Sequence, residues 1–313
     1  MGSFILRRLA TGVLLLLTVC TLAYYLLHLG AETVAYAILG ADATKADVAR
    51  FNELHGLDRP FVEQYWTWIS GAVRGDFGDP WVFTQSVSEA ITSRMSVTLI
   101  LAASALLLSA VISILLGVTA ALRGGWVDRF VQVLGLAGFA VPNFLLAFLL
   151  VAFFAVKYQV FSAVGWVPPS QDFGGFLKSA TLPILALSFA GIASVSQQVR
   201  GAVKDTLQLD FIRTLRTGGL SHKRVVFKHA LRNAAAPALS ILGLQFVGLL
   251  GGAVIIEQIF AIPGLGQFSV TATGAKDLPS VMGIVSMTAV IVITVNLVID
   301  LLSAALNPKV RLS

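Results

Sequence analysis

VTLILAASALLLSAVISILLGVTAAL, residues 97–122, is the stretch that decides the fold, because its 26 residues contain no charged side chain and no proline. The hydrocarbon core of a bilayer is about 30 Å thick, so an α-helix needs about 20 apolar residues to cross it. Within lipid, the backbone polar groups of a helix are satisfied by the helix itself. The stretch therefore predicts a transmembrane helix.

Five further apolar stretches flank this one. Together they predict an all-α integral membrane protein with six spans, at 9–29, 97–122, 130–156, 182–199, 238–259 and 281–305. The fourth is the shortest. The composition agrees, because 57% of the 313 residues are hydrophobic and 12% are charged. A soluble domain of this length does not need so much apolar surface.

Lys and Arg residues are distributed unevenly around the predicted spans. With a cytoplasmic N-terminus, 14 of the 22 Lys and Arg residues fall in inner segments, as expected because basic flanking residues stay on the cytoplasmic side. Eight of these lie between the fourth and fifth spans: Arg200, Lys204, Arg213, Arg216, Lys223, Arg224, Lys228 and Arg232. Both termini are predicted to be cytoplasmic. The first span follows Arg7 and Arg8, but its apolar run is too long for a cleaved signal peptide.

The predicted spans divide the chain into three regions: 1–29 with the N-terminus and first span, an extracytoplasmic segment at 30–96, and a transmembrane core at 97–313. The segment 30–96 carries nine acidic residues against five basic ones. It also contains aromatic residues with helical spacing that could lie on the membrane interface: Phe61, Tyr65, Trp66 and Trp68. A small folded subdomain is expected there.

The loop 200–237 carries the most informative short pattern. Its residues 205–237, DTLQLDFIRTLRTGGLSHKRVVFKHALRNAAAP, predict two helices separated by Gly218 and Gly219. Leu207, Phe211 and Leu215 recur at every fourth position, which predicts one apolar stripe on an amphipathic helix. This helical elbow is expected at the cytoplasmic surface. From the residues alone, it could equally rest on anionic lipid.

This elbow resembles the cytoplasmic signature loop of permeases from binding-protein-dependent ABC importers, with Arg213, Thr214, Leu215 and Gly219 at its centre. The family commonly has alanine at the position of Leu215 and lysine at that of Gly218. Other patches extend the resemblance along nearly the whole chain to the B-type subunits of dipeptide and oligopeptide permeases. They are GLDRP at 56–60, QY at 64–65, GDFG at 75–78, VPNF at 141–144, HALRN at 229–233 and EQIFAIPGLG at 257–266.

The resemblance implies a bacterial cytoplasmic-membrane importer in which this chain pairs with a second homologous permease subunit, cytoplasmic ATPase subunits and an extracytoplasmic solute-binding protein. It also implies that the elbow docks on the ATPase, through Leu207, Asp210, Phe211, Arg213, Thr214, Leu215, Arg216 and Gly219. Peptide is the expected cargo, while nickel, glutathione and sugar stay open because relatives carry them. A stand-alone secondary carrier is the alternative, and it would predict inverted repeats. The surrounding partner is lipid, and no nucleic acid is expected.

Polar groups in or near the spans are the candidates for a solute pathway or gate: Asn143, Gln245, Glu257 and Asn296. Such groups are costly in lipid unless they are hydrated, paired or buried in protein. Hydrogen bonds between helices are the alternative role, and for Glu257 the alternative is to stabilise the turn at Pro263 and Gly264.

The sequence predicts no enzymatic activity in this chain. It contains no Gly-Lys dipeptide, so it lacks the phosphate-binding G-x-x-x-x-G-K-[ST] loop, and ATP hydrolysis is expected in a partner. Its single cysteine, Cys20, excludes an internal disulfide, and the four histidines have no metal-binding spacing. No cofactor or metal is expected.

Overall fold

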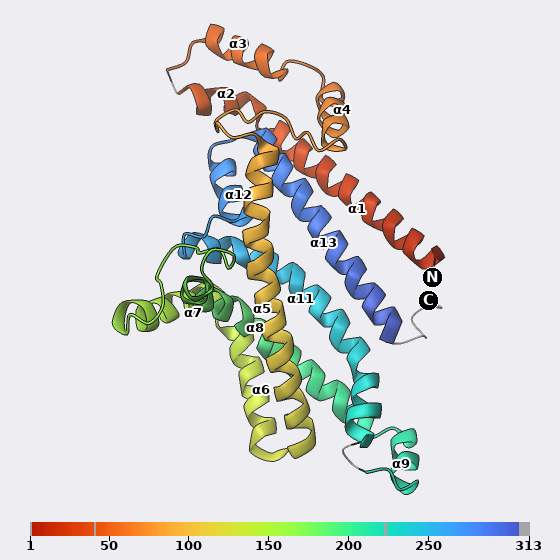
Figure 1. Ribbon diagram of the computed structural model, residues 1–313. Helices are drawn as coiled ribbons and strands as arrows, with labels where there is room; N and C mark the ends of the chain where they lie inside the picture. Colours follow the sequence, from red (N-terminus) through yellow and green to blue (C-terminus); the bar gives the residue numbers. More distant parts are fainter. Residues whose placement is uncertain (1, 41, 222–223, 307–313) are drawn as a thin grey trace. The chain divides into compact units, whose positions relative to one another are not determined.

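The computed structural model describes residues 2–40, 42–221 and 224–306, and all the regular elements in these ranges are helices (Figure 1). Lys223, Lys309 and Arg311, which contributed to the predicted orientation, lie outside the described residues. By its internal contacts the chain divides into two compact units. The N-terminal unit comprises Gly2–Val97 and Pro263–Ile293, and the core unit comprises Thr98–Ile262 and the described residues from Thr294 onward.

Helices long and apolar enough to cross a membrane recur along the described residues, which confirms the prediction of an all-helical membrane protein. They are Ile5–His28, Val87–Arg123, Phe173–Leu207, Ile241–Ile259 and Leu278–Ser303. The bent pair Gly125–Ala140 and Asn143–Lys157 is a sixth if its two parts form one span. The long helices α5 (Val87–Arg123) and α13 (Leu278–Leu306) contribute residues to both units.

The third predicted span, 130–156, is a broken helix instead of a straight one. α6 (Gly125–Ala140) is followed by α7 (Asn143–Leu150) and the π-helical turn η1 (Val151–Lys157), and the two parts meet at an angle of 100°. Val141 at the break is extended, with φ −98° and ψ 112°. Pro142 explains the break, because its ring disfavours the helical conformation in the preceding residue and it has no N–H to donate.

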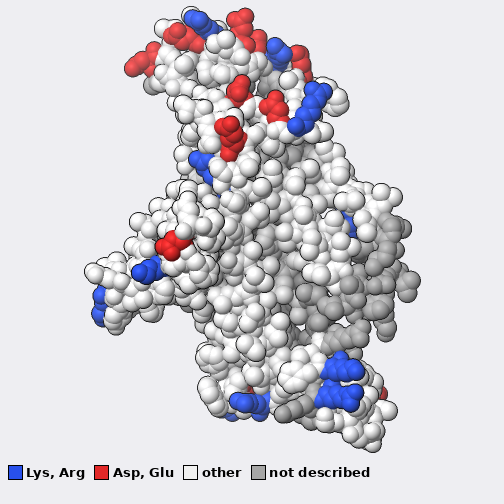
Figure 2. Space-filling view, in the orientation of Figure 1, with Lys and Arg blue, Asp and Glu red and all other residues white. Residues whose placement is uncertain are grey.

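The N-terminal unit contains α1 (Gly2–His28), α2 (Ala31–Leu39), α3 (Lys45–His55), α4 (Phe61–Ala72) and α12 (Leu265–Gly274). The start of α3 is a capping box, in which the Thr44 hydroxyl accepts from Asp47 N–H and the Asp47 carboxylate accepts from Thr44 N–H. Its end is set by Gly56 in the left-handed conformation, with φ 66°. Asp and Glu side chains are frequent over α2 to α4 (Figure 2).

Aromatic packing joins α4 to α1. The ring of Tyr24 on α1 lies 5.8 Å from that of Phe61, 5.5 Å from that of Tyr65 and 5.8 Å from that of Trp68. Aromatic pairs at these separations add to the energy of burial. Three of the four aromatic residues predicted for the membrane interface therefore pack inside the unit, and Trp66 is left 71% exposed.

The core unit is arranged around α8 (Phe173–Leu207), on which α6, α7 and α11 (Leu231–Ile259) pack. Small residues allow close approach, as is usual between helices in lipid. A Cβ atom on Gly117 of α5 would lie 2.7 Å from the Ser196 carbonyl oxygen of α8, and one on Gly138 of α6 would lie 2.1 Å from Cβ of Ala193. Glycine is therefore required at both contacts.

Candidate functional site

The predicted elbow consists of a break, a short helix and a π-helical turn. α8 ends at Leu207, Gln208 and Leu209 form the break, and α9 runs from Asp210 to Thr217. The sequence predicted one helix through residues 205–217, and this prediction was wrong at the break. After Gly219, whose φ is 81°, the chain reaches η2 (Val225–Ala230), which continues into α11.

The buried residue of α9 is Ile212, which the sequence analysis did not select. Ile212 is fully buried and forms a cluster with Val225 and Ala230 of η2. Leu207 and Leu215 pack against the same cluster. The cluster therefore joins the end of α8, the short helix α9 and the start of α11.

The predicted stripe required Phe211 to be buried with Leu207 and Leu215. In the structure Phe211 is not part of the buried cluster that Leu207 and Leu215 contact. Phe211 is 38% exposed, and the neighbouring Leu209 is 50% exposed. The break at Gln208 and Leu209 changes the helical phase, so the spacing of four residues does not carry from Leu207 in α8 into α9. Within α9, Phe211 and Leu215 are one turn apart, and Phe211 lies at the exposed edge of the side that Ile212 buries. The outer face of α9 thus presents two apolar side chains, Leu209 from the break and Phe211.

The remaining predicted docking residues lie at the surface. Asp210, Arg213, Thr214, Arg216 and Gly219 are all exposed. Arg213 lies 3.7 Å from Asp210, but both side chains are more than three-quarters exposed, so this pair contributes little to stability. Figure 2 shows Lys and Arg side chains gathered over this part of the core unit.

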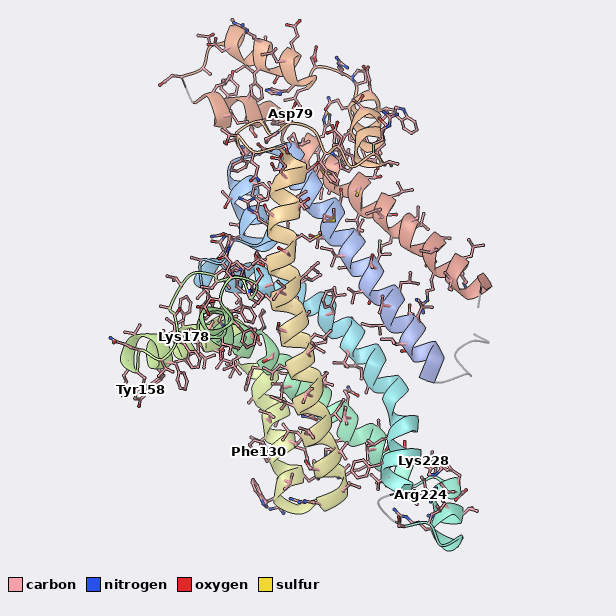
Figure 3. The ribbon with its side chains drawn as sticks, viewed as in Figure 1. Asp79, Phe130, Tyr158, Lys178, Arg224 and Lys228 are labelled. Carbon is pink, nitrogen blue, oxygen red and sulfur yellow. The ribbon has the colours of Figure 1, made fainter. Side chains whose placement is uncertain are left out.

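Figure 3 shows two of these basic side chains, Arg224 and Lys228, beside α9. They come from the residue before η2 and from η2 itself. The surface formed by the exposed side of α9 with this basic edge is called the elbow surface below.

A carboxylate on α6 is joined to two basic residues of α8. Asp128 pairs with Arg200 through Nε and accepts a second hydrogen bond from Arg200 Nη2 at 2.8 Å. Lys204 Nζ donates to the same carboxylate at 3.0 Å. The Asp128 side chain is only 16% exposed. Two of the eight basic residues predicted for the loop are therefore held within the helical packing.

This ion cluster was not predicted from the sequence, because Asp128 lies 72 residues from Arg200. The available signal was an acidic residue at the start of a predicted span, in an inner segment that is otherwise basic. Such a residue indicates a partner on another helix.

Of the four pathway candidates, Asn143 and Gln245 lie along the packing of α11. A Cβ atom on Gly252 of α11 would lie 3.5 Å from Nδ2 of Asn143 on α7. One on Gly191 of α8 would lie 2.8 Å from Nε2 of Gln245. Both side chains are partly buried, so each has a polar group beside a glycine where two helices approach closely.

Asn296 belongs to α13 and lies beside another glycine of α11. Its Oδ1 would be 3.5 Å from a Cβ atom on Gly243. Gly243 precedes Gln245 by two residues, which is a rotation of about 200° around an α-helix. Gln245 and the glycine beside Asn296 therefore face different sides of α11.

Glu257 is fully buried near the end of α11. Thr98 Oγ1 on α5 donates to Glu257 Oε1 at 2.7 Å. The backbone carbonyl of Glu257 also accepts from Ile262 N–H at 2.9 Å, which closes the turn after the helix. Ala261 in this turn has a φ of 48°, an uncommon value for a residue with a Cβ atom.

Three motif patches of the N-terminal unit meet around one pocket of about 360 Å³. Gln64 donates to the carbonyl oxygens of Leu57 and Arg59 at 3.2 and 2.7 Å, which ties α4 to the 56–60 patch. The side chain of Asp76, in the 75–78 patch, accepts from Gly78 N–H at 2.9 Å. Local hydrogen bonds thus join Gln64 to the 56–60 patch and stabilise the turn within the 75–78 patch.

His55 and Trp81 also line this pocket, and the buried Asp277 bonds to the backbone of Trp81. The ring of His55 lies 5.1 Å from that of Trp81, and burial lowers the pKa of the His55 imidazole. Asp277 is fully buried and accepts from the N–H groups of Trp81, Val82 and Ser280 at 2.7, 2.8 and 3.0 Å. No group of three or more His, Cys, Asp or Glu side chains in the described ranges could hold a metal ion.

Comparison with known proteins identifies relatives over the full length. A family model described as a binding-protein-dependent transport system inner membrane component matches residues 113–312, and the model of the N-terminal part of such membrane components matches residues 1–102. The chain is 36% identical over 312 residues to a putative peptide transport system permease protein of Brucella abortus, covering 99% of each chain.

Two further relatives have similar coverage. A probable peptide ABC transporter permease protein of Sinorhizobium fredii is 32% identical over 313 residues, covering 99% of this chain and 100% of the relative. The glutathione transport system permease protein GsiC of Salmonella typhimurium is 34% identical over 312 residues, covering 99% of each.

Proposed function

Because this chain belongs to the family of inner membrane components of binding-protein-dependent transport systems, we propose that it is a permease subunit of an ATP-driven importer of peptides. The full-length similarity to permeases named for peptide transport supports peptide as the cargo. Glutathione, the solute in the name of another relative, is the second candidate. Nickel and sugar stay open from the sequence.

The proposed assembly contains a second homologous permease subunit, cytoplasmic ATPase subunits and an extracytoplasmic solute-binding protein. In it, both termini of this chain lie in the cytoplasm and the segment 30–96 lies outside. ATP hydrolysis takes place in the partner subunits. The core unit forms part of the translocation pathway, with Asn143, Gln245, Glu257 and Asn296 as the candidates for pathway or gate residues.

The elbow surface is the proposed docking site for the ATPase. The observation that carries this proposal is that α9 buries Ile212, with Leu215 half-buried beside it, and leaves Phe211 at the edge of that side 38% exposed. A helix with a fixed inner side and an exposed outer side can bind a partner without losing its own packing. Phe211 would supply the apolar contact and the basic edge would face acidic groups.

The cluster around Ile212 gives this docking site a mechanical connection. It joins the end of α8 to η2 and the start of α11, so a displacement of α9 would reach both long helices. Closure of the ATPase subunits would then change the packing of α8 against α11, where Gln245 lies. Packed helices with two discrete arrangements are the usual basis of such transitions.

The docking proposal is tested with Phe211→Asp, because Phe211 is exposed and is not needed for the cluster around Ile212. We expect the variant to assemble with the second permease but to lose co-purification of the ATPase and ATP-driven uptake in proteoliposomes. Leu54→Asp is a matched control, since Leu54 is an exposed leucine of α3 in the other unit. Normal ATPase binding by the Phe211 variant would overturn the docking site.

Leu215→Asp is a different experiment. Leu215 packs against the cluster of Ile212, so a charge there should damage the elbow itself and lower thermal stability. A loss of coupling in that variant would follow from damage to the elbow, so it does not show that Leu215 contacts the ATPase.

Glu257→Gln tests the gate role of Glu257. Glutamine keeps the shape and an oxygen that can accept the hydrogen bond from Thr98, so the variant removes the charge and replaces the other carboxylate oxygen with an NH2 donor. We expect the complex to assemble normally and peptide uptake to fall. Loss of assembly would instead assign the carboxylate a structural role.

Cargo is tested by uptake in proteoliposomes that contain the whole complex with its solute-binding protein. Radiolabelled dipeptide should be taken up and should be displaced by unlabelled tripeptide. Uptake of labelled glutathione, nickel or sugar without uptake of the dipeptide would replace peptide as the cargo. Uptake by this chain without any partner would overturn the importer in favour of a carrier.

A further inference from the structure

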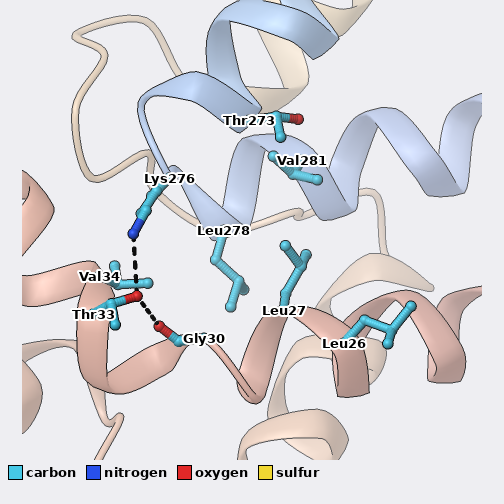
Figure 4. A pocket seen from close by; sticks show the side chains of 9 residues that line it. All are labelled: Leu26, Leu27, Gly30, Thr33, Val34, Thr273, Lys276, Leu278 and Val281. Atoms are coloured by element: carbon cyan, nitrogen blue, oxygen red, sulfur yellow. Dashed lines mark hydrogen bonds between the residues drawn. The ribbon is translucent and has the colours of Figure 1, made fainter.

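A second pocket of the N-terminal unit has the form expected of a phospholipid site. It has a volume of about 180 Å³ and lies where α1 ends, beside α2, the end of α12 and the start of α13 (Figure 4). It is separate from the pocket formed by the motif patches, although Leu278 lines both.

Most of this pocket is apolar. Val34, Leu278 and Val281 form a packed wall, with exposed fractions of 6%, 7% and 8%. Leu27 adds to the wall, and Leu26 at its rim is 66% exposed. A tightly packed apolar wall with an exposed leucine at the rim suits a hydrocarbon chain, because burial of each methylene group is favourable.

The polar end of the pocket is formed by Lys276 and Thr33. Lys276 Nζ donates to Thr33 Oγ1 at 3.1 Å, and Thr33 Oγ1 donates to the Gly30 carbonyl oxygen at 2.8 Å (Figure 4). An ammonium group has three donors, so this arrangement orients Lys276 and leaves donors for an anion. The side chain of Lys276 is exposed.

The nearest acidic neighbour in sequence, Asp277, does not neutralise Lys276. Its carboxylate is buried and accepts hydrogen bonds from three backbone N–H groups, those of Trp81, Val82 and Ser280. Within the described part of the chain, Lys276 forms no ion pair. Among the described residues, the ammonium group thus donates to Thr33 and has no counter-charge.

The position of the pocket along the candidate spans matches the layers of a membrane. The span of α1 ends at His28 and that of α13 begins at Leu278. Leu26 and Val281 fall inside these candidate spans and are expected in the hydrocarbon layer, while Thr33 and Lys276 lie beyond the ends of the spans, where lipid headgroups are expected. We propose that this pocket binds an anionic phospholipid, whose phosphodiester contacts Lys276 and whose acyl chain lies along Leu26 and Leu278.

The test uses the importer complex in nanodiscs of phosphatidylethanolamine and phosphatidylglycerol, with a photoactivatable phosphatidylglycerol that carries its diazirine on an acyl chain. We expect cross-links in peptides that contain Leu26 or Leu278. Lys276→Gln should reduce them about fivefold, the factor that one basic residue contributes at an anionic membrane surface. Lys276→Arg should restore them. Both substitutions keep a side chain at the positive φ of Lys276, 55°, so neither relieves backbone strain.

Two further variants separate the pocket from general attraction of lipid. Thr273→Phe places a ring at the exposed edge of the pocket and should also reduce the cross-links. Lys157→Gln is the control, because Lys157 is an exposed lysine at the end of another candidate span. Equal labelling of wild type and the Lys276→Gln variant would overturn the proposal, and so would unchanged labelling of the Thr273→Phe variant. Equal labelling by a photoactivatable phosphatidylcholine would overturn the preference for an anionic headgroup.

Discussion

Thr98 on α5 donates a hydrogen bond of 2.7 Å to the carboxylate of Glu257 on α11, and Glu257 is fully buried. A carboxylate inside a helical membrane protein is costly unless protein groups surround it and bond to it. This bond therefore fixes α5 to α11 at the point where α11 ends. Any role of Glu257 as a gate must begin from this bonded state.

Thr98→Val should destabilise the core unit. Valine has nearly the shape of threonine, but it leaves the buried oxygen of Glu257 without this donor, at a cost of about 1–3 kcal/mol. Thermal unfolding of the purified complex should show a lower midpoint than for wild type.

Thr119→Val on the same helix is the control. Among the described residues, the Thr119 hydroxyl bonds to the carbonyl oxygens of Leu115 and Leu116, within its own helix. A similar shift in both variants would show that the bond to Glu257 has no special importance.

Asp277→Asn should loosen the loop that follows the 75–78 patch. An asparagine has one acceptor oxygen, so it cannot accept all the bonds that the two carboxylate oxygens of Asp277 receive from Trp81, Val82 and Ser280. We expect a local loss of about 2–3 kcal/mol, because hydrogen bonds to charged groups are the stronger class. Hydrogen exchange should become faster at residues 79–86.

Asp79→Asn serves as the control for Asp277→Asn, since Asp79 lines the same pocket but is exposed. Equal protection of residues 79–86 in the wild type and the Asp277 variant would contradict the proposed role of Asp277 in holding this loop.

The apolar runs could be predicted from the sequence because a membrane imposes a length and a composition on each span. The run at 97–122 lies wholly inside α5. The break at Pro142 follows from a local rule, but its angle of 100° depends on how α6 and α7 pack on α8. Local rules therefore predicted where the helices lie in the sequence better than the angles between them.

The elbow shows why the candidate site was harder to predict. A spacing of four residues selected Phe211, but the break at Gln208 and Leu209 changed the phase and buried Ile212 instead. The partner of Asp277 could not be predicted at all, because Trp81 lies 196 residues away. Long-range bonds of this kind leave no periodic pattern in the sequence.

Asp128→Asn should weaken the packing of α6 on α8. It leaves Arg200 and Lys204 without their counter-charge, and because the three side chains are partly exposed we expect a loss of about 2 kcal/mol, below that of a fully buried pair. The midpoint of thermal unfolding should fall, and the effect should shrink in high salt. Asp205→Asn is the control, because Asp205 is an exposed carboxylate of α8, next to Lys204 in the sequence. An equal fall in both variants would contradict a specific ion cluster.

The stability of α3 should depend on pH through His55. The ring of His55 lies 4.4 Å from that of Phe51 and 5.1 Å from that of Trp81. Partial desolvation by these groups lowers the pKa of the exposed imidazole below its usual value of 6.5, and attraction to Asp277 offsets the shift only in part. The folded state therefore favours neutral His55.

The sign of the effect follows from proton linkage. Since the pKa is lower in the folded state, the unfolded state binds more protons, and stability rises with pH. The contribution of His55 is fully present above pH 6.5, declines as the pH falls through 6.5, and reaches its minimum below the pKa of the folded state. Hydrogen exchange of residues 45–55, corrected for the intrinsic dependence of exchange on pH, should be faster at about pH 5.5 than at about pH 7.5.

His55→Gln should remove most of this difference, because glutamine does not titrate. The capping box of α3 does not interfere in this window: its hydrogen bonds to Thr44 lower the pKa of Asp47 below 3.8, so Asp47 stays ionised until the pH is more acidic. An unchanged pH dependence in the His55→Gln variant would assign the effect to another group. A dependence of opposite sign, with slower exchange at low pH, would mean that attraction to Asp277 exceeds the cost of burying the charged imidazole.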